Sequence, residues 1–259
     1  MTDKNPQSVY EDKLIGTHIK KGKTILHSLK SFYKNYSFDI PVQLFTGSPR
    51  SFKRREIDEK DVEETFEYIH ANGINCYIHS SYVINLARVD NFEQMSCLQY
   101  DLNLGKLINS RGVVVHVGKN VKDLKITREM AIDNMEMNMR LLKISPETPL
   151  LLETPAGQGT ELLTTIEKFS DFMNRFKDDN CYGICVDTCH VFATGYHPME
   201  YIKRLTIEFN HKIDLIHLND SKEVLSSRKD RHAPVGMGHI GEEELFLCAC
   251  QDVNTVTEY

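Results

Sequence analysis

Short apolar runs alternate with longer segments of helical periodicity along most of this 259-residue chain. Seven apolar runs of strand length recur about every 33 residues, roughly one βα unit each. They span residues 14–19, 41–46, 75–80, 112–117, 149–154, 182–188 and 213–219. Several are continuous runs of Val, Ile and Leu, which is typical of parallel strands buried on both faces.

The segments between these runs have the features of helices. Residues 58–73 begin with acidic side chains and end at Asn72-Gly73, a plausible helix C-cap. Residues 128–145 and 160–176 have helical spacing, and their Met stripes indicate core packing. Residues 242–252 suit a seventh helix.

Seven βα units in a row predict a (β/α)₈ TIM barrel, which typically needs about 250 residues. Only residues 253–259 remain for an eighth strand, and no eighth helix follows them. We therefore expect the eighth βα unit to be truncated or divergent. The sequence predicts a flexible polar tail over 1–13 and a single domain over 14–259 that is incomplete at its C-terminus.

The composition places the chain in a reducing compartment. No apolar run approaches the roughly 20 residues of a membrane span, and the polar N-terminus does not have the pattern of a signal peptide. Seven scattered cysteines, an odd number, favour reduced thiols and hence a cytoplasmic or nuclear protein that is not secreted. Cys181, Cys185 and Cys189 are interpreted as packed thiols. We expect a monomer.

The charge balance argues both for and against nucleic-acid binding. A net charge of −6 is unlike the basic domain that nucleic acids usually require, but bound divalent cations would offset several carboxylates. Basic residues also cluster after three of the predicted strands. These clusters are Lys20, Lys21 and Lys23; Arg50, Lys53, Arg54 and Arg55; and Arg228, Lys229 and Arg231.

Side chains that can bind metals stand at the ends of the predicted strands. They are His18, His79, His116, Glu153, Asp187 with His190, and His217. Because the C-terminal strand ends of a parallel barrel converge on one face, we expect these groups to meet there. Imidazole with carboxylate suits Zn²⁺ or Mn²⁺. Asp230 and His232 add an i, i+2 pair, so we expect two or three ions.

Three stretches carry a resemblance to a known family. Residues 151–162 (LLETPAGQGTEL), 185–198 (CVDTCHVFATGYHP) and 217–241 (HLNDSKEVLSSRKDRHAPVGMGHIG) closely resemble the signature motifs of the endonuclease IV family. These proteins are TIM-barrel endonucleases that act at abasic sites in DNA. Weaker likeness at 17–19, 43–52 and 79–87 extends the resemblance over roughly residues 14 to 245.

The resemblance implies a centre of three zinc ions, in which Mn²⁺ could take part. On the matching positions, His79, His116 and Glu153 would hold the first ion. Glu153 would bridge to the second, which would also bind Asp187 and His217. His190, Asp230 and His232 would hold the third. The family's last strand supplies one more Glu to the second ion, for which Glu258 is a possible substitute at shorter spacing.

The resemblance also implies a reaction in base excision repair of DNA damage. The chain would hydrolyse the phosphodiester bond 5′ to an abasic site in duplex DNA through a hydroxide between two zinc ions, with Glu153 as the bridging catalytic residue. The products would be a 3′-hydroxyl and a 5′-deoxyribose phosphate. Arg50 and Tyr82 match positions that enter the minor groove of the DNA.

Other functions stay open at this point. If no group replaces the last Glu ligand, the chain could bind abasic lesions without cutting them. A metal-dependent sugar isomerase would use similar ligands on the same fold, but it would need a catalytic Lys in its pocket. A purely structural barrel would bind no metal.

Overall fold

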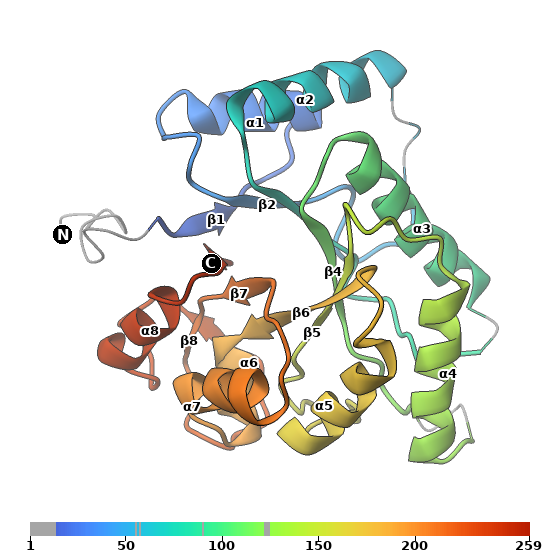
Figure 1. Cartoon of the computed structure of the whole chain (residues 1–259), viewed down its shortest axis with the longest axis vertical. Helices are drawn as coiled ribbons and strands as arrows, with labels where there is room; N and C mark the ends of the chain where they lie inside the picture. Colours follow the sequence, from blue (N-terminus) through green and yellow to red (C-terminus); the bar gives the residue numbers. More distant parts are fainter. Residues whose placement is uncertain (1–13, 55, 57, 90, 122–124) are drawn as a thin grey trace.

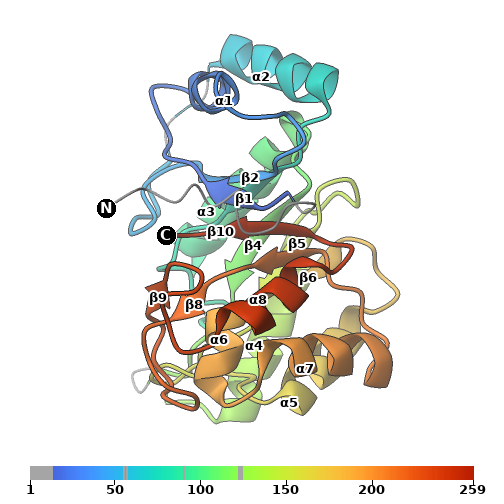
Figure 2. The ribbon, with the colours of Figure 1, turned by 90° about the vertical axis from the view of Figure 1, so that its left-hand side faces the viewer.

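A closed parallel barrel is the centre of the computed structural model, which describes residues 14–54, 56, 58–89, 91–121 and 125–259. Its strands follow the order β1-β10-β7-β6-β5-β4-β3-β2, and all neighbours pair in parallel. Helices surround the strands (Figures 1 and 2). The predicted tail over 1–13 and Arg55 lie outside the described residues.

The barrel strands are three to six residues long. They are β1 (Gly16–His18), β2 (Val42–Phe45), β3 (Cys76–His79), β4 (Gly112–His116), β5 (Leu150–Glu153), β6 (Tyr182–Asp187), β7 (Leu215–His217) and β10 (Asn254–Thr257). Two further short strands, β8 (Asp220–Ser221) and β9 (His232–Ala233), form an antiparallel pair beside the barrel.

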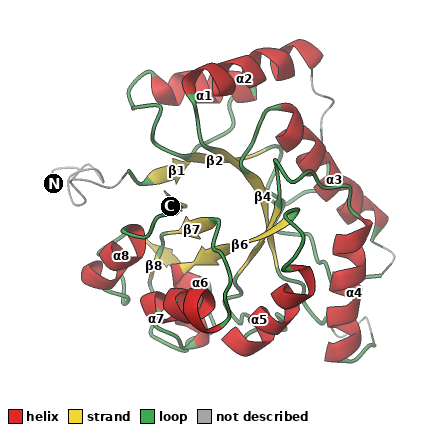
Figure 3. Cartoon of the chain, viewed as in Figure 1, coloured by secondary structure: helices red, strands yellow, loops and turns green. Residues whose placement is uncertain are grey.

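Helices lie around the strands in the ribbon coloured by secondary structure (Figure 3). They are α1 (Ile25–Tyr33), α2 (Glu59–Asn72), α3 (Phe92–Leu107), α4 (Arg128–Leu141), α5 (Ile166–Met173), α6 (Thr188–Thr194), α7 (Pro198–Lys203) and α8 (Glu242–Ala249). A 3₁₀ turn over Asn174–Phe176 extends α5, and a π-helical turn over Arg204–Glu208 extends α7.

Local side-chain chemistry sets several helix ends. Thr24, Thr127 and Thr165 each accept a hydrogen bond from a backbone N–H of the first helical turn. Gly73 ends α2 in the left-handed conformation at φ +63°, as its sequence position predicts. The prediction of a helix from residue 160 was wrong at its start. Leu163 has a left-handed backbone at φ +57°, which a helix cannot contain, so α5 begins only after Thr165.

All seven predicted strands are confirmed in position. The eighth strand is the informative case, because so few residues were left for it. Residues Asn254–Thr257 form β10, which lies between β1 and β7 and completes the ring. The divergence that the sequence suggests therefore does not leave the barrel open between β7 and β1.

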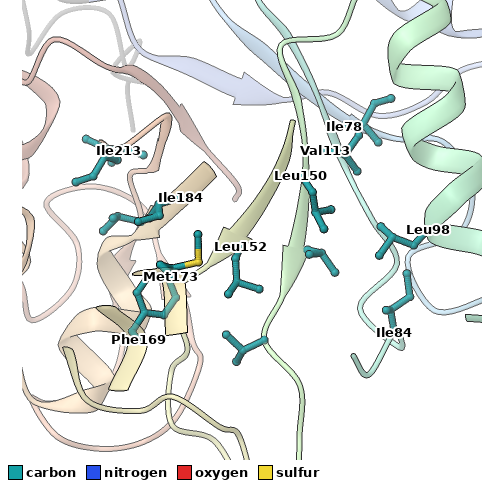
Figure 4. Close-up of a cluster of buried hydrophobic side chains, with 14 of the residues drawn as sticks. Ile78, Ile84, Leu98, Val113, Leu150, Leu152, Phe169, Met173, Ile184 and Ile213 are labelled. Carbon is teal, nitrogen blue, oxygen red and sulfur yellow. The ribbon is translucent and has the colours of Figure 1, made fainter. Parts of the chain in front are cut away.

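Two apolar layers hold the strands in place. The larger layer lies between the strands and the outer helices, where Val113, Leu150 and Leu152 pack near Leu98 of α3 and Phe169 of α5 (Figure 4). The smaller layer fills the barrel interior. It consists of Tyr77, Val114, Leu151, Cys185, Leu215 and Val256, one residue from each of six strands. Every member is nearly or fully buried, so the interior is a packed plug and not a channel.

Candidate metal centre

Besides β1, whose last residue His18 lies 3.9 Å from Glu258, six barrel strands each bring one imidazole or carboxylate to the same end of the barrel. These residues are His79, His116, Glu153, Asp187 and His217, each the last residue of its strand, and Glu258, directly after β10. Parallel strands all end on one face, so residues far apart in sequence meet there. Their potential ligand atoms fall into groups within 4.8 Å of one another, each able to hold an ion.

The first group joins β3, β4 and β5. Nε2 of His79 lies 3.3 Å from Oε2 of Glu153, and Nε2 of His116 lies 3.0 Å from the same oxygen. Glu153 is only 1% exposed. Two imidazole nitrogens therefore converge on one carboxylate oxygen, as the sequence predicts.

The second group uses the other oxygen of the same carboxylate. Nδ1 of His217 lies 3.2 Å from Oε1 of Glu153, 3.2 Å from Oε2 of Glu258 and 3.9 Å from Oδ2 of Asp187. The four residues form one candidate ligand set. Glu153 thus belongs to both groups, with one oxygen turned toward each.

The third group comes from segments beyond β6 and β7: His190 lies in α6, Asp230 in a loop, and His232 begins β9. Nε2 of His190 lies 3.4 Å from Asp230, and Nε2 of His232 lies 3.1 Å from Asp230 and 3.5 Å from Asp187. Asp187 therefore reaches two groups, whereas the sequence assigned it to one. The thiol of Cys189 also lies within reach of Asp230 and His232, although burial raises its pKa to about 12.

The charges at this face are mutually dependent. Burial by itself would raise the pKa of Glu153, but the neighbouring His116 and His217 hold it well below the usual range. Burial would lower the pKa of His217, but the carboxylates and thiol around it raise it well above its usual value. Burial would also lower the pKa of His190, but Asp187 and Asp230 raise it well above its usual value. Burial would raise the pKa of Asp230, but His190 and His232 lower it.

The residues fit divalent cations. Nε2 of His190 and Nε2 of His232 are buried and make no hydrogen bond of acceptable geometry within the described part of the chain. A buried nitrogen without a partner is costly, and a metal ion would satisfy it. Nδ1 of His79 faces the carbonyl oxygen of Ser80 at 2.8 Å, and Nδ1 of His190 faces that of Thr154 at 2.9 Å. Each imidazole thus donates from Nδ1 and leaves Nε2 free to bind a metal.

The two predicted DNA-contacting residues lie on neighbouring loops at the same face. Arg50 is exposed, and Tyr82 is 43% exposed while its ring packs against Phe45, His79 and His116. The backbone N–H of Tyr82 donates to the carbonyl of Pro49 at 2.9 Å. This bond couples the position of Tyr82 to the loop that carries Arg50.

Several members of the basic clusters have partners within the protein. Arg54 donates from Nε and Nη2 to both oxygens of Asp101 on α3, at 2.8 Å each, and both side chains are buried. Lys21 donates to the carbonyl of Thr46. Within the basic cluster at 50–55, Arg54 is thus engaged by Asp101 inside the protein.

Asn219 and Gln43 also belong to the centre, but the sequence did not predict them there. Asn219 donates to Asp187 at 2.7 Å and to Glu258 at 3.3 Å. Nε2 of Gln43 donates to Glu258 at 2.7 Å, and Oε1 of Gln43 lies 2.9 Å from Nε2 of His217. The only sequence signal was strand period two, which turns Gln43 to the same side as the ligands. Glu258 itself carried that signal, since it lies two residues after the interior residue Val256.

Comparisons with known proteins agree with this geometry. A family model described as a xylose isomerase-like TIM barrel matches residues 40–247. A relative named as an endonuclease 4, from Acanthamoeba polyphaga mimivirus, is 32% identical over 91% of this chain and 80% of its own length. The chain belongs to the endonuclease IV family. The solved endonuclease IV of Thermus thermophilus has a TM-score of 0.78 and 26% identity, covering 95% of this chain and 92% of that one.

The fold on its own is shared more widely than the family. A D-tagatose 3-epimerase-like protein has a TM-score of 0.71 with 16% identity, over 94% of this chain and 90% of that one. That likeness concerns the fold alone, so the endonuclease IV family is the more specific finding. None of the helices in the described ranges is long and apolar enough to cross a membrane.

Proposed function

We propose that this chain is a DNA-repair endonuclease that hydrolyses the phosphodiester bond 5′ to an abasic site in duplex DNA. The products would be a 3′-hydroxyl and a 5′-deoxyribose phosphate. One observation carries the proposal: Glu153 turns one carboxylate oxygen to His79 and His116 and the other to His217. A carboxylate shared in this way suits a bridge between two metal ions, and the family is one of endonucleases.

The ligand sets follow from the three groups. His79, His116 and Glu153 would hold one zinc ion. Glu153, Asp187, His217 and Glu258 would hold a second, and His190, Asp230 and His232 a third, with Asp187 in reach. Bound divalent ions would supply a nucleophile at neutral pH and neutralise charge on the phosphate and the leaving oxygen.

The chain's own side chains would select and place the DNA. Glu153, fully enclosed, would fix the spacing between the first two sites. Tyr82 and Arg50 stand on coupled loops beside the centre, where they would enter the minor groove and hold the duplex kinked. A nucleotide without a base is the cheapest to turn out of the stack, which would favour abasic sites.

Glu258 bears on the alternative function. A protein that binds lesions without cutting them was favoured by the lack of a final acidic ligand. Glu258 lies 3.2 Å from His217 and belongs to the second group. This position of Glu258 supports the cutting enzyme over the alternative.

Incision of a duplex that contains one synthetic abasic site tests the proposal. We expect a nick on the 5′ side of the site without added Mg²⁺, resistant to EDTA and inhibited by phenanthroline, because buried zinc exchanges slowly. Elemental analysis of the same sample should find about three zinc ions per chain. A strict need for fresh Mg²⁺, or a metal-free active protein, would contradict the proposal.

A further inference from the structure

Gln43, on β2, is fully buried and contacts the side chains of His217, Glu258 and His18. Its Oε1 lies 2.9 Å from Nε2 of His217. Its Nε2 lies 2.7 Å from Oε1 of Glu258 and 3.2 Å from Nδ1 of His18. This amide therefore joins β2 to two members of the second group, on β7 and beyond β10.

The donor and acceptor chemistry fixes the direction of these bonds. An ionised carboxylate only accepts hydrogen bonds, so the atom of Gln43 next to Glu258 must be the NH₂ group. The other atom is then the carbonyl oxygen, which only accepts. Nε2 of His217 must consequently carry the hydrogen. When Nδ1 of His217 binds a metal ion, Nε2 is the only ring nitrogen left to carry it.

His217 is the reverse of the other oriented histidines. His79 and His190 donate from Nδ1 to backbone carbonyls and present Nε2 to the centre. His217 presents Nδ1, which faces Glu153 and Glu258, and donates from Nε2. A backbone carbonyl orients the first two rings, but a side chain orients His217. Its orientation can therefore be removed by one substitution that leaves the backbone intact.

We propose that Gln43 is a positioning residue that holds His217 with Nδ1 turned toward Glu153 and Glu258, and thereby sets the affinity of the second group for its ion. The thiol of Cys185, which also contacts His217, is a much weaker acceptor and cannot replace the amide. This inference rests on the proposed function, since it assumes that the second group binds a divalent cation.

Gln43→Met tests the inference, because Met nearly keeps the volume and removes the hydrogen bonds to His217, Glu258 and His18. Zn²⁺ affinity should fall for one ion by about 10- to 100-fold, the range for groups that orient metal ligands, while the other two ions stay bound. Competition with a chromophoric chelator measures each affinity. Cadmium NMR of the Cd²⁺-loaded protein should show one resonance shifted or broadened and two unchanged, independently of any activity.

Gln43→Glu separates the bond to His217 from the bond to Glu258. The new carboxylate can still accept from Nε2 of His217, but while ionised it repels Glu258 instead of donating to it. If orientation of His217 is what matters, Gln43→Glu restores the Zn²⁺ affinity to the order of the wild type. An affinity as low as that of Gln43→Met would assign the effect to Glu258 and overturn the inference.

Asn138→Leu provides the structural control. Asn138 is another buried amide, and it donates to the carbonyls of Leu86 and Arg88, away from the ligand groups. This variant should lower the unfolding temperature and keep three ions at wild-type affinity. If the wild type binds three ions and Gln43→Met binds them equally well, the proposed role of Gln43 is refuted and the proposed function is not. A wild-type chain that binds no zinc would instead refute the proposed function.

Discussion

Two layers of side chains, here called the floor and the mouth, lie inside the barrel on or directly after the same six strands. On each strand, the mouth residue comes two positions after the floor residue. The floor consists of Tyr77, Val114, Leu151, Cys185, Leu215 and Val256. The mouth consists of His79, His116, Glu153, Asp187, His217 and Glu258. A step of two residues advances about 7 Å along a strand and returns to the same face.

Four of the six mouth residues are as buried as the floor, and His116 and Glu258 are partly buried, so the two layers differ mainly in what holds them together. The floor is stabilised by apolar contacts, which need no specific partner. The mouth buries acidic and imidazole groups that are stable only when paired with one another or with ions. Burial therefore does not separate core from site in this barrel, whereas the chemistry at alternate positions does.

Glu153→Gln should have the largest effect on function. It removes the shared charge at the mouth while keeping the shape, so turnover on abasic DNA should fall by about 10²- to 10³-fold or more. Binding of the duplex should stay measurable by fluorescence anisotropy. Near-normal turnover would exclude Glu153 as the bridging residue.

Leu151→Ala, two residues earlier on the same strand, should lower the stability of the fold and leave metal binding intact. A cavity in the floor should lower the free energy of unfolding by about 2–5 kcal/mol, measured by urea denaturation. The folded fraction should still bind its full complement of zinc. Loss of metal without loss of stability would show that the two layers are not separable.

Glu258→Gln probes the mouth at the strand that closes the ring. We expect about a 10- to 100-fold loss of affinity for one ion, because the second group would lose one of its three carboxylates and keep Glu153, Asp187 and His217. Chelator competition measures this loss. Wild-type affinity in the variant would remove Glu258 from the ligand set.

Tyr82→Ala should weaken binding to abasic duplex by about tenfold, the lower range for loss of an aromatic contact to nucleic acid. Metal content should not change. Tyr36 is the matched control, because it is equally exposed at 43% but follows α1 at the opposite end of the barrel. Equal losses in Tyr82→Ala and Tyr36→Ala would argue against a specific role.

The smallest effect that we expect is the change with pH of the free energy of unfolding of the metal-free chain. Glu153 has a lowered pKa in the folded chain, so its stabilisation is present above the ordinary value of 4.5 and is lost as pH falls through the folded pKa. His217 has a raised pKa, so its stabilisation is present below 6.5 and is lost as pH rises through the folded pKa.

The free energy of unfolding of the stripped protein should therefore be greatest between about pH 4.5 and 6.5. Urea denaturation at a series of pH values measures it. Adding zinc should move the maximum to higher pH, because metal ligands must be deprotonated. A stripped protein whose stability keeps increasing above neutral pH would contradict the ion pairs of the mouth.

Much of the barrel could be predicted because its signals are local. Apolar runs locate the strands, and a histidine or acidic residue near the end of a run indicates a side chain of the mouth. The left-handed turn at Leu163 and the partner of Arg54, 47 positions away, have no such local signal. Glu258 and Gln43 depend on which strands become neighbours and in what register, so composition and spacing could not assign their contacts.

The join between β1 and β10 has a consequence for how the chain folds. Oγ1 of Thr257 donates to the carbonyl of Gly16, 241 positions away. Contacts of such high sequence separation form late and slowly, since a long loop must be ordered first. An ion held by His217 and Glu258 would fasten the other edge of β10 to β7, so zinc supplied during refolding should speed the final closure and protect the amides of β10 from hydrogen exchange.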